Sequence, residues 1–307
     1  MSHLYTEVHG SGPTLVLLHG WGLNVRVWDG LAAALCDRFR IVTVDLPGHG
    51  RSAWLPQRSS LEEQAAQVGE TVAAIAGEYS LLGWSLGGQI ALQLAAARGD
   101  SVIRRPGPEP HRDPHPHPDT RPDPHRHLQP RPAAGAAMNR LVLIAATPRF
   151  VAGPDWPHGA PAERLAAQAA GLRTDYRRTV SDFLELQVRG SAGGAEALEQ
   201  LRGALFAHGR TDPHGQPDAA GPDLAALACG LELLGDTDLR PLLAGITLPA
   251  LVIAGQYDRV IQPAASHALA DSLPNARYVE IRRAAHAPFL SHLPQLSALL
   301  FDFLLPT

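Results

Sequence analysis

The stretch Leu81–Gly88, with the sequence LLGWSLGG, places one serine between glycines at the end of an apolar run. An apolar run that ends in glycine and is followed by a helical pattern indicates a strand, a tight turn and a helix. Glycines lack a Cβ and therefore allow a very sharp turn. Ser85 would stand at that turn, strained and exposed, where the amino end of the helix favours a developing negative charge. The stretch thus predicts either a structural turn or a serine nucleophile, and the rest of the chain decides between them.

Short apolar runs recur along the chain and alternate with longer helical patterns. Their hydrophobicity is continuous, which is typical of parallel strands covered on both faces. We expect strands at Thr14–Gly20, Arg40–Gly48, Tyr79–Ser85, Arg140–Pro148, Ala250–Asp258 and Ala276–Arg283. We expect helices at Val27–Leu35, Leu61–Ala76, Leu86–Arg98 and Leu293–Leu304. The alternation predicts an α/β fold with a mostly parallel central sheet and helices on both faces.

Two segments interrupt this alternation. Residues 149–244 contain helical patterns but no convincing strand, and we expect a helical cap between residues 1–148 and 245–307 of the core. Residues 101–137 hold ten prolines and five histidines but few apolar residues. We expect this segment to be a disordered insertion. Its histidines leave a metal-binding segment open as an alternative.

The composition excludes several classes of protein. The 307 residues are 45% hydrophobic, enough for a large core, and the net charge of −4 argues against binding to nucleic acid or a membrane surface. No apolar run reaches the roughly 18 residues of a membrane span, and the N-terminus does not resemble a signal peptide. Cys36 and Cys229 stand in no zinc-ligand spacing, and no phosphate-binding loop is visible. We expect a cytoplasmic monomer without metal or cofactor.

A base and an acid that could activate the serine stand later in the chain. A serine hydroxyl is a weak nucleophile until a base removes its proton. His286 follows the last expected strand in RRAAHAPFLSH, and Asp258 follows another in GQYDRVIQP. The carboxyl ends of parallel strands meet at one edge of a sheet, so these residues can form a triad with Ser85 in the chain order Ser, Asp, His. Ser85 would be the nucleophile, His286 its base, and Asp258 the acid that orients the base.

Two backbone N–H groups are also needed to stabilise the oxyanion of such a reaction. Leu86 directly follows the serine and offers one of them. The turn His19–Gly22 follows the first expected strand, and within it the N–H of Trp21 is the best second candidate. We expect the side chain of His19 to be structural. Asp45, in the tight loop DLPGHGRS, precedes the nucleophile and makes a poor triad member.

Several motifs together resemble a known superfamily over nearly the whole chain. LLHGWG, DLPGHGRS, GWSLGG, YDRVIQP and AAHAPF are similar to the α/β hydrolases. RTVSDFLELQ and GLELLGDTDLR, which general hydrolases do not share, resemble the family of pimeloyl-acyl-carrier-protein methyl ester esterases of biotin synthesis. The resemblance implies the α/β-hydrolase fold with an inserted cap and a serine esterase that releases methanol. Ser85, Asp258 and His286 fall on the triad of that family.

The resemblance also implies how the substrate is held. Trp21 and Leu86 fall on the family's substrate and oxyanion positions, beside Ser85 and His286. The run Phe183, Leu184, Glu185, Leu186 and Gln187 falls on its substrate-lining cap motif.

The implied partner is an acidic acyl-carrier protein that brings the substrate and meets arginines of the cap. Arg178 falls on such a position, and Arg177 and Arg189 lie near it. Ala195 and Glu199 stand where the resemblance would place basic residues.

Other functions remain open at this point. A broad-specificity short-chain carboxylesterase or a C–C bond hydrolase would use the same three residues on small-molecule substrates. A catalytically silent binding protein of the same fold is an alternative from another class, although such proteins usually lack a triad member.

Overall fold

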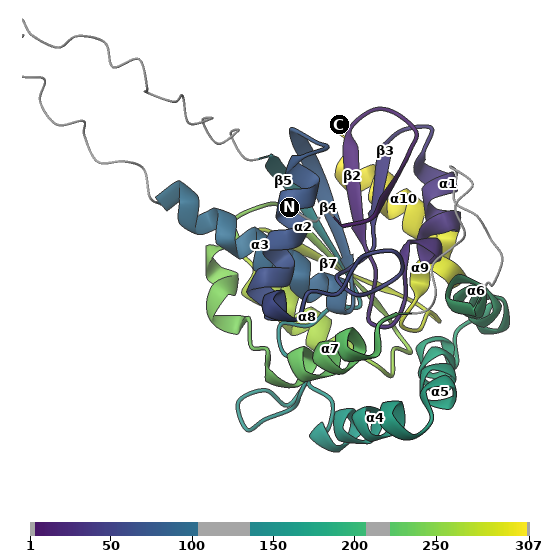
Figure 1. Cartoon of the computed structure of the whole chain (residues 1–307). Helices are drawn as coiled ribbons and strands as arrows, with labels where there is room; N and C mark the ends of the chain where they lie inside the picture. Colours follow the sequence, from purple (N-terminus) through teal and green to yellow (C-terminus); the bar gives the residue numbers. More distant parts are fainter. Residues whose placement is uncertain (1–3, 104–135, 207–221, 306–307) are drawn as a thin grey trace, which may run out of the picture.

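The computed structural model describes residues 4–103, 136–206 and 222–305 (Figure 1). Within these residues one sheet has seven strands in the order β1-β3-β2-β4-β5-β6-β7. β1 runs antiparallel to β3, and all other pairs are parallel. The strands are β1 Thr6–His9, β2 Thr14–Leu18, β3 Arg40–Val44, β4 Glu78–Trp84, β5 Ala137–Ile144, β6 Ala250–Gly255 and β7 Ala276–Ile281.

The mostly parallel sheet predicted from the sequence is confirmed, and one strand was missed. Each of the six expected strands is present and ends a few residues earlier than expected, because the final residues form the loops of the site. β1 is a four-residue edge strand in which only Glu7 is buried. It has no apolar run, so its pairing with β3 was not visible in the sequence.

Helices cover both faces of the sheet. α2 (Leu61–Ala73), α3 (Leu86–Ile103) and α8 (Pro263–Ser272) lie on one side, and α1 (Asp29–Leu35) packs with α10 (Leu293–Leu304) on the other (Figure 1). The described residues also form short helices in the connecting segments. They are η1 Val25–Trp28, η2 Pro56–Arg58, η3 Arg240–Gly245 and α9 Pro288–Ser291. None of the helices in the described residues is both long and apolar enough to span a bilayer.

Both ends of the stretch expected to be a proline-rich insertion belong to regular elements. Ser101–Ile103 form the last turn of α3, and Ala137 begins β5. The first proline of the segment is Pro106, so nothing before it prevents the helix from continuing past Arg98. Residues 104–135 lie outside the described residues.

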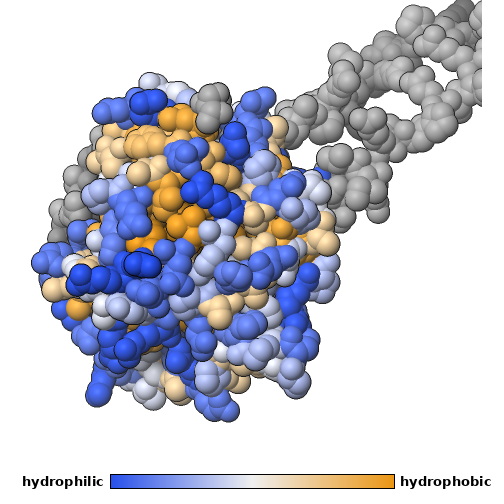
Figure 2. All heavy atoms as spheres, turned by 180° about the vertical axis from the view of Figure 1, so that it is seen from behind, coloured by the Kyte–Doolittle hydropathy of each residue, from blue (hydrophilic) through white to orange (hydrophobic). Residues whose placement is uncertain are grey.

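Four α-helices of the described residues lie between β5 and the short helix η3, where the sequence predicts a cap. They are α4 Ala162–Thr174, α5 Tyr176–Val188, α6 Gly194–Phe206 and α7 Leu224–Asp236. Figure 1 shows them beyond the carboxyl ends of the parallel strands, and we call them the cap. Seen from behind, the lower half of the surface, where the cap lies, is mostly hydrophilic, and hydrophobic residues gather in the upper half (Figure 2).

The strand order places a natural crevice next to β2. The chain runs from β2 to β3 on one side and then to β4 on the other, so the loops after β2 and β4 diverge. Ligands of open α/β sheets bind at such a switch point. His19 and Gly20 follow β2, and Ser85 follows β4. The two candidate loops of the sequence therefore meet at the binding edge of the sheet.

Candidate active site

Ser85 occupies the sharp turn between β4 and α3. Its φ angle is +56°, a left-handed conformation that residues with a Cβ rarely adopt. A side chain at Gly83 would overlap the carbonyl oxygen of Gly87, and a Cβ at Gly87 would lie 2.5 Å from the carbonyl oxygens of Leu18 and His19. The flanking glycines are thus required by close packing, which holds the serine in its strained position.

The other two candidate residues form a buried pair at the ends of β6 and β7. His286 Nδ1 lies 2.7 Å from Asp258 Oδ2, and both side chains are almost fully buried. The second carboxylate oxygen, Oδ1, accepts hydrogen bonds from the N–H groups of Val260 (2.8 Å) and Ile261 (2.9 Å). Asp258 is therefore held as an acceptor, so His286 carries its proton on Nδ1 and presents an unprotonated Nε2.

Backbone contacts fix His286 beside the serine turn. The indole N–H of Trp84, the residue before Ser85, donates to the carbonyl of His286 at 2.9 Å. A side chain at Gly255 would overlap the carbonyl of Ala285, so glycine is needed for the two loops to approach. Nε2 of His286 is buried and has no hydrogen-bond partner in the described part of the chain. This basic nitrogen is available to accept a proton, and catalytic hydrogen bonds often form only when substrate is bound.

The loop after β2 packs directly against the serine turn. A Cβ built on Gly20 would lie 3.3 Å from Cβ of Ser85. Within the described residues, the backbone N–H groups of Trp21 and Leu86 donate to no acceptor. Leu86 begins α3, where backbone N–H groups have no partner within the helix. The residue after the serine and the loop packed against it thus each carry an unpartnered donor, and their role as an oxyanion hole stays a prediction.

His19 links this loop to the loop after β3. Its Nε2 accepts from the N–H of Leu46 at 3.0 Å, so the proton resides on Nδ1, 2.8 Å from the carbonyl oxygen of Gly20. Burial, together with the nearby His49 ring, lowers the pKa of His19 to about 3, and the ring stays neutral. The C=O of Gly20 and the N–H of Trp21 belong to one trans peptide and point in opposite directions. By holding the carbonyl, the side chain of His19 fixes the peptide that carries this N–H, and we expect it to position the donor.

Replacing His19 by alanine should lower kcat about tenfold to a hundredfold, less than the roughly 10²–10³ of losing an oxyanion donor outright. KM for a short ester should change little, because the contact orients a donor for the transition state. His49→Ala is the control: its ring lies 5.4 Å from that of His19, but its Nδ1 bonds to the carbonyl of Pro47. Equal losses of kcat in both variants would argue against this positioning role.

Asp45 belongs to a buried network that includes His19, whose Nε2 lies 3.9 Å from Asp45 Oδ1, and not to the His286–Asp258 pair. Its Oδ1 accepts from the N–H of Val25 at 2.7 Å and its Oδ2 from the N–H of Arg51 at 2.8 Å. Burial raises the pKa of this carboxyl to about 6, although the two hydrogen bonds from backbone N–H groups lower it. Asp45 thus ties two loops together, while His286 bonds to Asp258.

The end of α5 covers the site. The carbonyl of Gln187 accepts from the N–H of His286 at 2.9 Å, and the ring of Phe183 meets that of Trp21 edge-on at 5.2 Å. The side-chain amide of Gln187 is buried, and neither its nitrogen nor its oxygen has a partner among the described residues. Such a group costs about 1–3 kcal/mol unless a ligand satisfies it.

The five-residue cap run does not face the site as a whole. Leu184 is buried in the cap, and Glu185 Oε1 pairs with Arg202 Nη2 of α6 at 3.0 Å. Phe183 and Leu186 line a pocket of about 260 Å³ between α4, α5 and Val260. Phe183 and Leu186 therefore border an open pocket, whereas Leu184 and Glu185 make contacts within the cap, and the substrate-lining role of the run stays a prediction.

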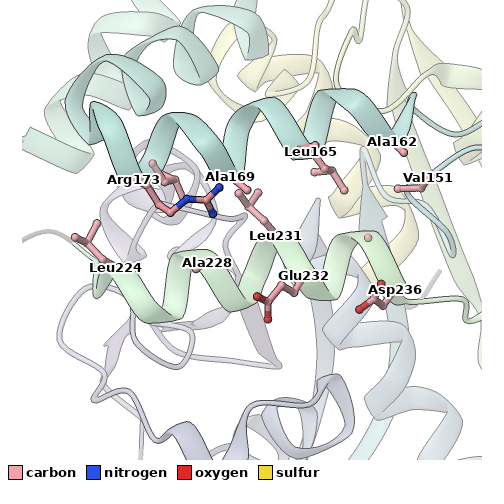
Figure 3. Close-up of a pocket in the computed structure, with 13 residues that line it drawn as sticks. Val151, Ala162, Leu165, Ala169, Arg173, Leu224, Ala228, Leu231, Glu232 and Asp236 are labelled. Atoms are coloured by element: carbon pink, nitrogen blue, oxygen red, sulfur yellow. The ribbon is translucent and has the colours of Figure 1, made fainter.

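A larger pocket of about 610 Å³ lies between α4 and α7 (Figure 3). Its wall is apolar at Leu165 and Leu231, with Arg173 near one end and Asp236 near the other. No triad candidate lines it. No group of three histidine, cysteine or acidic side chains in the described residues could hold a metal ion.

Comparisons with known proteins agree on the family. The profile of the Alpha/beta hydrolase family matches residues 15–298. A protein named pimeloyl-[acyl-carrier protein] methyl ester esterase from Nitrosomonas europaea is 35% identical over 305 residues, covering 99% of this chain and 100% of its own. Those of the same name from Aeromonas hydrophila and Xanthomonas campestris are 35% and 36% identical and cover at least 97% of both chains.

Solved structures share the fold. An esterase from Exiguobacterium antarcticum has a TM-score of 0.73 at 19% identity, covering 98% of this chain and 94% of its own. A hydrolase from Oleispira antarctica has a TM-score of 0.74 at 20% identity, with the same coverage. The resemblance noted in the sequence is confirmed by the full-length relatives. The chain therefore belongs to the Alpha/beta hydrolase family, as a carboxylic ester hydrolase of the group formed by the pimeloyl-[acyl-carrier protein] methyl ester esterases.

Proposed function

We propose that the protein hydrolyses the methyl ester of pimeloyl-acyl-carrier protein to pimeloyl-acyl-carrier protein and methanol, a step of biotin synthesis. The full-length similarity to relatives of that name supports the substrate. One observation supports the chemistry: the strained Ser85 follows Trp84, which donates to the carbonyl of His286, and this histidine is paired with Asp258 while its outer nitrogen is unpartnered.

In the first half of the reaction, Ser85 Oγ attacks the ester carbonyl carbon, and its proton passes to His286 Nε2. The carbonyl oxygen becomes an oxyanion, which the N–H groups of Trp21 and Leu86 stabilise. Asp258 accepts the hydrogen bond of Nδ1–H and stabilises the charged imidazole. The C–O bond to the methoxy group then breaks, and His286 returns its proton to the departing oxygen as methanol forms.

In the second half, water attacks the acyl group on Ser85. His286 removes one proton from the water, and a second oxyanion forms between the same two N–H groups. When the bond to Ser85 Oγ breaks, the histidine protonates the serine. The product is a free carboxyl at the end of the pimeloyl chain.

The cap supplies an apolar surface for the chain that carries the ester. Phe183 and Leu186 line the smaller pocket, and a neutral methyl ester can enter such a site at little cost. The product carboxylate loses hydration there, which favours its release. The unpartnered amide of Gln187 can bond to the ester or to the attacking water.

The test is the ratio of kcat/KM for the carrier-linked methyl ester to that for a short p-nitrophenyl ester. We expect a preference of about a hundredfold for the former, or about 2.7 kcal/mol of transition-state binding. The free methyl ester of pimelic acid is the matched substrate without the carrier. Equal or reversed rates would contradict the carrier-linked role and favour a broad short-chain carboxylesterase.

A further inference from the structure

Five exposed arginines surround the loops that carry Asp258 and His286. They are Arg164 on α4, Arg189 after α5, Arg259 after β6, and Arg282 and Arg283 after β7. We call them the arginine rim.

Backbone contacts hold the segments of the rim together. Arg164 Nη1 donates to the carbonyl of Arg259 at 2.7 Å. The N–H of Arg283 donates to Gln256 Oε1 at 3.0 Å, which joins the loop after β7 to the loop after β6. The N–H of Ala192, in the turn that follows Arg189, donates to the carbonyl of Arg283 at 2.9 Å. The five residues therefore lie on one connected set of loops.

The guanidinium groups of the rim take part in no ion pair within the described residues, although Asp182 lines the same pocket as Arg164. No carboxylate in the described residues forms an ion pair with any of its five members. The acid on the same loops, Asp258, is buried and bound to His286. Tyr257 is 44% exposed on this surface. Arginine and tyrosine are enriched in protein interfaces, and unpaired guanidinium groups attract an acidic partner.

The α5–α6 face of the cap, by contrast, carries several ion pairs. Arg178 Nε lies 3.7 Å from Asp182 on α5. On α6, Arg202 pairs with Glu185 at 3.0 Å and with Glu199 at 3.1 Å. Of the three arginines predicted to contact the carrier, Arg178 has this acidic neighbour, Arg177 has no ion pair within the described residues, and Arg189 is also a member of the rim.

A pocket lies between one arginine of the rim and residues that contact the site. The pocket of about 260 Å³ is lined by Arg164 and also by Phe183, which contacts Trp21. Its wall includes Val260, whose N–H bonds to Asp258. None of the triad candidates lines this pocket, and Asp182 does, so Phe183 and Val260 are its links to the site.

From the unpaired charge and this pocket we infer that the arginine rim is the docking surface for the acidic carrier protein, and that the acyl chain enters along Arg164 and Phe183. The inference rests on the proposed function and moves the carrier from the α5–α6 face of the cap to the loops after β6 and β7.

The experiment compares two double variants with the same change in charge. Arg282→Glu/Arg283→Glu alters the rim, and Arg177→Glu/Arg178→Glu alters the start of α5. We expect the rim variant to lower kcat/KM for the carrier-linked ester about tenfold at low salt, mainly through KM, with a smaller loss at about 0.5 M salt. Its activity on the p-nitrophenyl ester should stay near that of the wild type, and the α5 variant should lose less than threefold on the carrier-linked ester.

The outcomes separate the two proposals. If the wild type prefers the carrier-linked ester and the α5 variant loses that preference while the rim variant keeps it, the rim assignment is wrong and the proposed function stands. If neither variant changes the preference, the rim is likewise refuted. If the wild type shows no preference for the carrier-linked ester, the proposed function fails, and the rim assignment fails with it.

Discussion

Replacing Ser85 by alanine is expected to lower kcat for ester hydrolysis by about five to six orders of magnitude, to the level supported by the remaining site. The acyl-enzyme cannot form, because no other hydroxyl stands at the turn between β4 and α3. Alanine has the same Cβ and adopts a φ of +56° about as well as serine, so the fold should persist. The measurement is steady-state hydrolysis of the carrier-linked ester and of a p-nitrophenyl ester.

The control for this variant is its binding of substrate. The cap residues Phe183 and Gln187 are untouched, so the alanine variant should still bind the carrier-linked methyl ester. A titration by calorimetry gives the dissociation constant of the variant. This constant should be close to the KM of the wild type if the chemical step of the wild type is slower than substrate dissociation. If the variant kept more than a hundredth of the wild-type kcat, Ser85 would not be the nucleophile.

Replacing Asp258 by asparagine is expected to lower kcat by about 10⁴-fold with little change in KM. The asparagine oxygen can still accept from the N–H groups of Val260 and Ile261. Its NH₂ group would then face His286 Nδ1, 2.7 Å away in the wild type, and would favour the tautomer with the proton on Nε2. A histidine in that tautomer cannot take the proton from Ser85.

Asp45→Asn is the matched control, because Asp45 is the other buried aspartate of these loops. It should lower the free energy of unfolding, since the NH₂ group would face the N–H of Val25 or Arg51. The kcat of the folded fraction should fall far less than in the Asp258 variant. If both variants lost kcat equally, the role of Asp258 would be that of a loop support rather than of an orienting acid.

Local sequence patterns predicted most of the strands and helices. The continuous apolar runs of β2 to β7 and the apolar faces of the helices are properties of neighbouring residues. The glycines around Ser85 are also a local sequence pattern, because the turn that needs them is only a few residues long. Local patterns failed where little is buried, as in β1, whose position depends on its pairing with β3.

The sequence by itself determined the fold class, the family and the three residues proposed for catalysis, because each is expressed in a short motif or in the order of motifs along the chain. Tertiary structure alone decided which groups those residues meet. The tautomer of His19 is set by the N–H of Leu46, which is 27 residues away and donates to its Nε2. The side chain of Glu185 is bound by Arg202, which lies on another helix. The arginine rim gathers on loops that only the folded sheet brings together. Contacts between distant segments depend on how strands and helices pack, and no local pattern of residues encodes them.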